Sequence, residues 1–159
     1  MGDKEKGIKV IARNRKARHD YEILQKFEAG LVLTGTEVKS LRQGRVNLSD
    51  AYAVIRKGEI FLKNLDIPEY SHGNRMNHEP KRPRKLLLHA SEITRIAVKV
   101  TERGLALVPL SIYFKGGWAK VELALARGRR LYDKRQSMKK KEDRREMDRA
   151  LRRRVRRGE

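Results

Sequence analysis

The residues with the clearest potential for chemistry lie in one proline-rich segment, between residues 66 and 84. Two carboxylates and two imidazoles occur there, and such groups bind divalent cations or act as general bases. Their spacing matches no zinc or two-metal pattern, and the neighbouring lysines and arginines would repel a metal ion. We therefore expect a solvated loop of turn-forming residues, with no metal, cofactor or catalytic residue, at Asp66, Glu69, His72 and His78.

Clusters of lysine and arginine are the stronger signal. The 159 residues carry a formal net charge of +20, which destabilises the compact state by self-repulsion and favours a polyanionic partner. Nucleic acid is the first candidate and an anionic membrane surface the second. One cluster alone would indicate a solvated face, but four together favour nucleic acid, with the cations on phosphates. The clusters occupy residues 14–19, 39–45, 81–85 and the C-terminal region.

Two aromatic residues near cations, Tyr21 and Trp118, could stack on exposed bases, with core packing as the alternative for both. Core packing is the expectation for Phe27, Phe61 and Phe114. The chain has no Walker motif and no dinucleotide-binding glycine motif, so charge and stacking are the expected means of binding.

The composition changes after Ala126. Residues 127–159 contain 16 Lys/Arg and 6 Asp/Glu and too few apolar side chains for a core. On a helix, one face would carry a cationic row and roughly the opposite face an apolar row. Because like charges at i, i+4 repel, we expect this tail to be disordered alone and to become helical among phosphates. The cationic row is Lys141, Arg145, Arg149, Arg153 and Arg157, and the apolar row is Met147, Leu151 and Val155.

The pattern before the break predicts short antiparallel strands. They are expected at residues 8–12, 21–33, 51–55, 59–65, 105–114 and 118–126, with a turn or bulge at 29–30 dividing the second. Lys57-Gly58 and Gly116-Gly117 indicate tight hairpins, and alternation at 121–126 predicts a strand buried on one face. Thr34 and Ser91 are the expected N-caps of two helices. Residues 14–20 are expected to form a turn or a single helical turn.

These elements predict a mainly β fold: a small antiparallel OB-like β-barrel with two or three short flanking helices and a basic C-terminal tail. The expected domains are an RNA-binding barrel at residues 1–126 and the tail at residues 127–159. The sequence has no cysteine and no apolar run of membrane-spanning length. We therefore expect a cytoplasmic protein without a membrane partner.

Several segments resemble the signatures of the small protein B family, the bacterial SsrA-binding proteins. They are residues 14–21, 35–42, 77–89, 121–128 and 133–135. The resemblance implies an OB-like barrel with a tail that is disordered in solution. It also implies a non-catalytic adaptor that binds the tRNA-like domain of transfer-messenger RNA. With that RNA, and indirectly with EF-Tu, such adaptors reach stalled ribosomes, where the nascent chain is tagged for proteolysis.

The resemblance also implies roles for individual residues. Glu28, Leu87 and Lys120 match positions implicated in RNA binding, although a carboxylate repels phosphate; Glu28 would accept from a base amino group or brace an arginine. Basic motifs match at Asn14, Arg15, Arg18, Tyr21, Lys39, Arg42 and Arg45. For the tail, the resemblance implies contacts with two places on the ribosome. The residues expected in the decoding centre are Gly128, Tyr132, Asp133, Lys134 and Arg135. The helix expected in the mRNA channel carries Lys141, Arg145, Arg149 and Arg153.

Two other classes are open on the residues alone. A metal-dependent nuclease on an OB-like body would need two or three converging carboxylates, which the spacing does not provide. A permanent ribosomal protein or general single-strand binder would share the charge but would lack a preference for one folded RNA.

Overall fold

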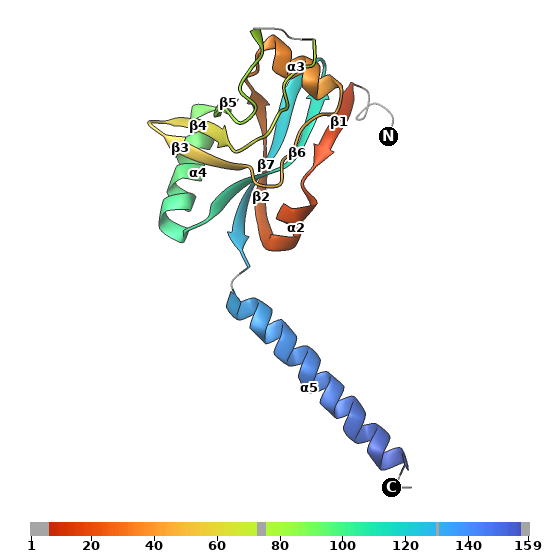
Figure 1. The fold of residues 1–159 in the computed structure, drawn as a ribbon. Coiled ribbons are helices and arrows are strands. Elements are labelled where there is room, and N and C mark those ends of the chain that lie inside the picture. Colours follow the sequence, from red (N-terminus) through yellow and green to blue (C-terminus); the bar gives the residue numbers. More distant parts are fainter. Residues whose placement is uncertain (1–6, 73–75, 130, 157–159) are drawn as a thin grey trace. The chain divides into compact units, whose positions relative to one another are not determined.

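The computed structural model describes residues 7–72, 76–129 and 131–156, and it describes no side chains for residues 131–140. The chain divides into two compact units, Met1–Gly128 and Arg129–Glu159 (Figure 1). In the described part of the first unit, three helices accompany seven strands. The helices are α2 (Arg15–Asp20), α3 (Gly35–Arg42) and α4 (Ala90–Arg103); the strands are β1 (Ile8–Arg13), β2 (Tyr21–Leu31), β3 (Tyr52–Arg56), β4 (Glu59–Lys63), β5 (Arg84–Leu87), β6 (Ala106–Lys115) and β7 (Trp118–Gly128).

All strand pairings are antiparallel, which confirms the predicted mainly β class. The sheet has the order β1-β6-β3-β4-β5-β2-β7, and β7 also pairs with β6. Six strands are therefore linked in a closed circuit, and β1 is added along part of β6. Both predicted hairpins are confirmed, and positive φ at Lys57, Gly58, Gly116 and Gly117 matches the turns that suit twisted strands.

Two local predictions are wrong. β2 is one strand with its irregularity between Ile23 and Gln25, because Ala29 is fully buried and Gly30 is paired on both sides. Residues 15–20 form the short helix α2, which is the helical alternative predicted there. Helix α4 begins one residue before Ser91, with His89 as its N-cap, where the Glu92 carboxylate accepts from the His89 backbone N–H at 3.3 Å.

The core occupies two places. The larger cluster lies between the sheet and α3 and α4, and includes Leu41, Ile60, Leu62, Ile96 and Leu123. A smaller cluster covers the other face of β6 and β7, where α2 packs through the small side chain of Ala17. Residues 123–126 of β7 are consequently buried on both faces. The prediction of one-sided burial there is wrong because it did not anticipate α2.

A buried ion-pair network joins α3 to the segment before β5. Glu37 and Arg84 are both fully buried and form an ion pair, and Arg82 also binds Glu37. The Arg84 guanidinium donates further hydrogen bonds to the carbonyl oxygens of Leu65 at 2.6 Å and Pro80 at 2.9 Å. These bonds satisfy carbonyl oxygens of the loop between β4 and β5, so the network helps to hold that loop in place.

The hydrogen bonds of this network determine the ionisation state of the Glu37 carboxylate. Burial raises the pKa of Glu37, but hydrogen bonds from Arg82, the Thr34 backbone N–H and Arg84 outweigh burial, so the pKa lies below its ordinary 4.5. Burial lowers the pKa of Arg84 below its ordinary value, yet an arginine remains charged at neutral pH. The pair is therefore ionic at neutral pH.

Candidate nucleic-acid interface

One exposed face of the sheet combines the three residues that the family motifs single out. Directly paired residues share a face, and the pairings align Leu87 on β5, Gly30 on β2, Lys120 on β7 and Tyr113 on β6 in one row. Glu28 lies two residues from Gly30 on the same strand, so it points to the same face. We call this surface the outer face. Its side chains come from Lys26, Glu28, Leu87, Tyr113, Lys115, Trp118, Lys120 and Glu122.

The outer face offers both cations and exposed apolar surface. Leu87 is 54% exposed and Trp118, beside the β6–β7 turn, is 74% exposed. Core packing is therefore excluded for Trp118. A Cβ atom at position 30 would lie only 3.2 Å from the Leu87 Cβ, so the glycine leaves the space beside Leu87 free. Exposed apolar side chains among lysines suit a nucleic acid, which presents both bases and phosphates.

Glu28 contacts a tyrosine and a lysine rather than an arginine. The Tyr113 hydroxyl donates to its carboxylate at 2.6 Å, and the Lys115 ammonium at 3.3 Å. The Tyr113 hydrogen bond, helped by Lys115 and nearby Lys120, lowers the pKa of Glu28 below its ordinary 4.5. Burial and the hydrogen bond to Glu28 raise the pKa of Tyr113. Glu28 is thus an anion that orients neighbours on the outer face.

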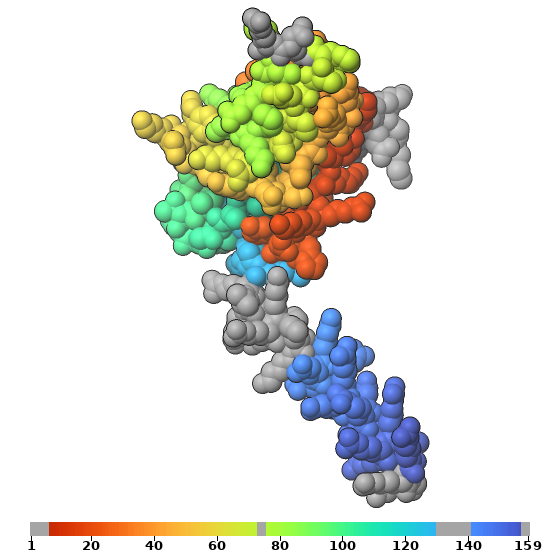
Figure 2. Space-filling view, in the orientation of Figure 1, coloured from red at the N-terminus to blue at the C-terminus, as the bar shows by residue number. Residues whose placement is uncertain are grey.

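Helix α2 presents a second set of cations beside this face. Arg15 and Arg18 are exposed, and Tyr21 is half-buried at the start of β2. The red N-terminal segment that carries α2 lies on the surface with side chains extending outward (Figure 2). Asn14, in contrast, is 3% exposed: its side-chain oxygen accepts from the Ala17 N–H, and its amide donates to the Leu48 and Pro109 carbonyls. Its side chain is fully engaged within the protein.

Asn14→Ala should lower the free energy of unfolding by about 2–3 kcal/mol, because it removes a helix cap and leaves two carbonyls without their donor. Urea unfolding followed by circular dichroism measures this change. Arg15→Ala, at the adjacent exposed position, is the control and should change stability by about 0.5 kcal/mol or less. Equal effects of the two substitutions would contradict the structural role of Asn14.

The cations of α3 lie against aromatic rings. The Lys39 ammonium is 5.5 Å from the centroid of the Tyr70 ring, and the Arg42 guanidinium is 5.7 Å from that of Phe114. Arg45 donates to the Glu69 carbonyl at 3.3 Å. All three cations are exposed, so they are held in place and remain available to an anion.

The proline-rich segment differs from its prediction at His78, whereas Glu69 and His72 are exposed as expected. His78 is 7% exposed, with Nε2 donating to the Ile67 carbonyl and Nδ1 at 2.9 Å from the Thr36 hydroxyl, so it is part of the folded body rather than of a solvated loop. The cluster at residues 81–85 is only partly a surface feature, because Arg82 and Arg84 turn inward to Glu37. No group of three potential metal ligands occurs among the residues that the structure describes.

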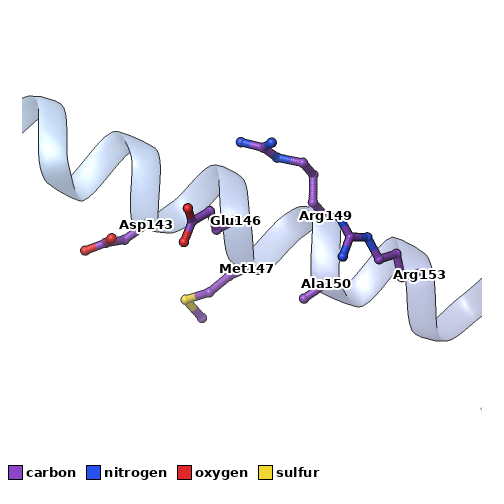
Figure 3. Close-up of a pocket in the computed structure, with 6 residues that line it drawn as sticks. All are labelled: Asp143, Glu146, Met147, Arg149, Ala150 and Arg153. Carbon is purple, nitrogen blue, oxygen red and sulfur yellow. The ribbon is translucent and has the colours of Figure 1, made fainter.

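In the second unit, helix α5 (Leu131–Arg156) carries the predicted apolar row and the predicted cationic row as far as Arg153, and Arg157 lies outside the described residues. Figure 3 shows the Arg149 side chain directed away from Met147 and Ala150 on this helix. The side chains of Lys141, Arg145, Arg149 and Arg153 are exposed, as are those of Met147, Leu151 and Val155. The side chains of Tyr132, Asp133, Lys134 and Arg135 lie outside the described residues, and Gly128 ends β7. The predicted disorder of the free tail remains a prediction.

Four outer-face residues were missed by the sequence reasoning: Lys26, Tyr113, Lys115 and Glu122. Strand periodicity could have found two of them, because residues separated by two positions share a face with Glu28 or Lys120. Lys26 precedes Glu28 by two, Glu122 follows Lys120 by two, and Lys115 follows Tyr113 by two. The pairing of β6 with β7 was needed to bring Tyr113 beside Lys120.

Comparisons with known proteins agree with one another. The family model described as SmpB protein matches residues 11–153. An SsrA-binding protein of Syntrophobacter fumaroxidans is 62% identical over 146 residues, 92% of this chain and 91% of that protein. One from Acidothermus cellulolyticus is 61% identical over 152 residues, 96% of each chain. A chain in the solved structure "tmRNA-SmpB: a journey to the center of the bacterial ribosome" has 53% identity and a TM-score of 0.64, covering 76% of this chain and 85% of that one.

Proposed function

The chain belongs to the SmpB protein family, and from that premise we propose that it binds the tRNA-like domain of transfer-messenger RNA and delivers this RNA to stalled ribosomes. The related proteins are named SsrA-binding proteins, and the similar solved structure joins SmpB with tmRNA and the bacterial ribosome. Rescue and nascent-chain tagging follow as the consequence of that delivery.

One observation carries the RNA-binding part of the proposal. Glu28, Leu87 and Lys120 are far apart in the sequence but lie in adjacent rows of one exposed face. The face adds Lys115 and the exposed Trp118 ring to them. Lysines would contact phosphates, while Leu87 and Trp118 would pack against sugars or unpaired bases. The exposed cations of α2 and α3 would extend the contact, with Asn14 holding α2 in place.

The tail would act on the ribosome. We assign Gly128, Tyr132, Asp133, Lys134 and Arg135 to the decoding centre, with Tyr132 supplying a stacking ring. The cationic row of α5 would lie in the mRNA channel, where phosphates surround it and remove the repulsion between its arginines.

Other parts of the proposal rest on this assignment. The protein supplies charge and shape rather than catalysis, EF-Tu takes part indirectly through the charged RNA, and the location is the cytoplasm, where ribosomes work. None of the described helices is long and apolar enough to span a membrane. The closed circuit of strand pairings supports an OB-like barrel as the form of the body.

Lys120→Met should weaken binding to transfer-messenger RNA by about tenfold at moderate salt. The slope of log affinity against log salt concentration should become shallower by the amount that one phosphate contact contributes. Filter binding over a series of salt concentrations measures both quantities. Lys57→Met, in the exposed β3–β4 turn, is the control and should change affinity by less than about twofold. A wild-type protein that binds an unrelated RNA hairpin of equal length as tightly would identify a general RNA binder instead.

A further inference from the structure

Two carboxylates face each other at the centre of a cationic surface. Glu28 on β2 is paired directly with Glu122 on β7, so both side chains project from the outer face. Like charges in directly opposed positions destabilise a sheet, and carboxylates repel the phosphates that this face is proposed to bind. A local arrangement that is unfavourable in both respects indicates a functional requirement.

Glu122 is surrounded by cations from two elements. The Lys26 ammonium, on β2, lies 3.5 Å from its Oε1, and the Arg18 guanidinium, on α2, lies 3.9 Å from the same oxygen. That oxygen is shielded from solvent and has no hydrogen-bond partner within the described ranges. The carboxylate therefore acts on Arg18 and Lys26 through charge rather than through a closed hydrogen bond.

The backbone brings Arg18 to this place. Asn14 caps α2, and Ala17 packs against Ala124 and Ala126 of β7, which are both fully buried. Because Arg18 follows Ala17 in the helix, it stands at the edge where α2 meets the outer face, within reach of Glu122. The helix and the sheet thus share one electrostatic contact.

Glu28 restrains a second group of side chains in the same manner. It accepts hydrogen bonds from Tyr113 and Lys115, both on β6. The two opposed carboxylates thereby restrain side chains that arise from α2, β2 and β6. Long cationic side chains lose conformational entropy when they bind, and prior restraint reduces that loss.

We propose that Glu122 is a positioning residue for RNA recognition, which holds Arg18 and Lys26 in the arrangement that matches one folded RNA, while Glu28 holds Tyr113 and Lys115 beside them. This inference rests on the proposed binding of transfer-messenger RNA. It gives the carboxylates a role in specificity: they reduce attraction to RNA in general and increase the fit to a particular set of phosphates.

The test uses the full-length protein as wild type, Glu122→Gln, Arg18→Met and the double variant, with transfer-messenger RNA and an unrelated hairpin of equal length as probes. Glu122→Gln should weaken binding to transfer-messenger RNA about fivefold, whereas binding to the hairpin should be unchanged or tighter. Adding Glu122→Gln to Arg18→Met should then weaken binding by clearly less than about fivefold, because one of the two positioned cations is already absent and only Lys26 remains to be released.

Thermal unfolding establishes that each variant is folded. If Glu122→Gln does not fold, Glu122→Asp keeps the charge but shortens its reach, and the same loss and the same non-additivity are expected. Multiplied losses in the double variant would mean that Glu122 contacts RNA itself, and tighter binding to both RNAs would mean that it is only a repulsive charge; either result overturns the proposal. Equal wild-type affinity for the two RNAs would remove the proposed function and this inference with it.

Discussion

Truncation after Arg129 should abolish the tagging of nascent chains on stalled ribosomes, while affinity for transfer-messenger RNA at moderate salt stays within about threefold of the wild type. The proposed RNA contacts all lie in the first unit, and the tail is a separate unit. The cut must follow Gly128, because Tyr21 pairs with Gly128 and Glu22 with Arg127. A reconstituted translation reaction on a messenger RNA without a stop codon measures tagging, and filter binding measures affinity.

A full-length triple variant separates the decoding-centre residues from the rest of the tail. Asp133→Ala, Lys134→Ala and Arg135→Ala together should remove tagging as completely as truncation does. Asp148→Ala, Arg152→Ala and Arg154→Ala, which change one acid and two bases outside the cationic row, should leave most of it. Lost RNA affinity on truncation, together with normal tagging by the first triple variant, would refute the division of labour between body and tail.

Arg84→Met should lower the free energy of unfolding by about 3–5 kcal/mol, because it leaves Glu37 buried with only part of its charge compensated. The substitution also removes the donor to the Leu65 and Pro80 carbonyls. Since a domain of this size has a total stability of about 5–15 kcal/mol, the variant should approach unfolding at 37 °C. Urea unfolding at pH 7 is the measurement.

The adjacent ion pair provides the control. Lys85→Met breaks the half-exposed pair with Glu59, whose atoms are 3.2 Å apart, and should change stability by less than about 1 kcal/mol. The effect of Arg84→Met should also shrink with acidity. The folded wild type has the pKa of Glu37 lowered, so its stabilisation is present above the ordinary value of 4.5 and is lost as the pH falls below it. A deficit of Arg84→Met that grew between pH 7 and pH 4 would contradict the assignment.

Local sequence patterns predicted the parts of the fold that depend on near neighbours. Gly58 and Gly116-Gly117 adopt the positive φ that tight hairpins need. Thr34 and Glu37 form the expected capping arrangement at α3. The cationic and apolar rows of α5 follow from helix periodicity alone. In each case a few adjacent residues contain all the necessary information.

Long-range packing decided the rest. Arg84 looked like one of five surface residues in a basic cluster, but it is fully buried because Glu37, 47 residues earlier, provides its counter-charge. Asn14 looked like part of an RNA-binding motif, yet its amide binds carbonyls of two other segments. Charge and hydrogen-bonding capacity are read from a residue's type, whereas its partner depends on which segments the fold brings together.

The outer face shows the same limit. The composition and the motifs were sufficient to predict a basic RNA-binding protein, and the family matches at Glu28, Leu87 and Lys120 were visible in the sequence. That these three residues lie in adjacent rows, and that Glu28 is opposed to Glu122, follows only from the pairing of β2 with β5 and β7. Strand register is determined by the burial of the whole sheet, since a shift of one residue would turn every side chain to the other face.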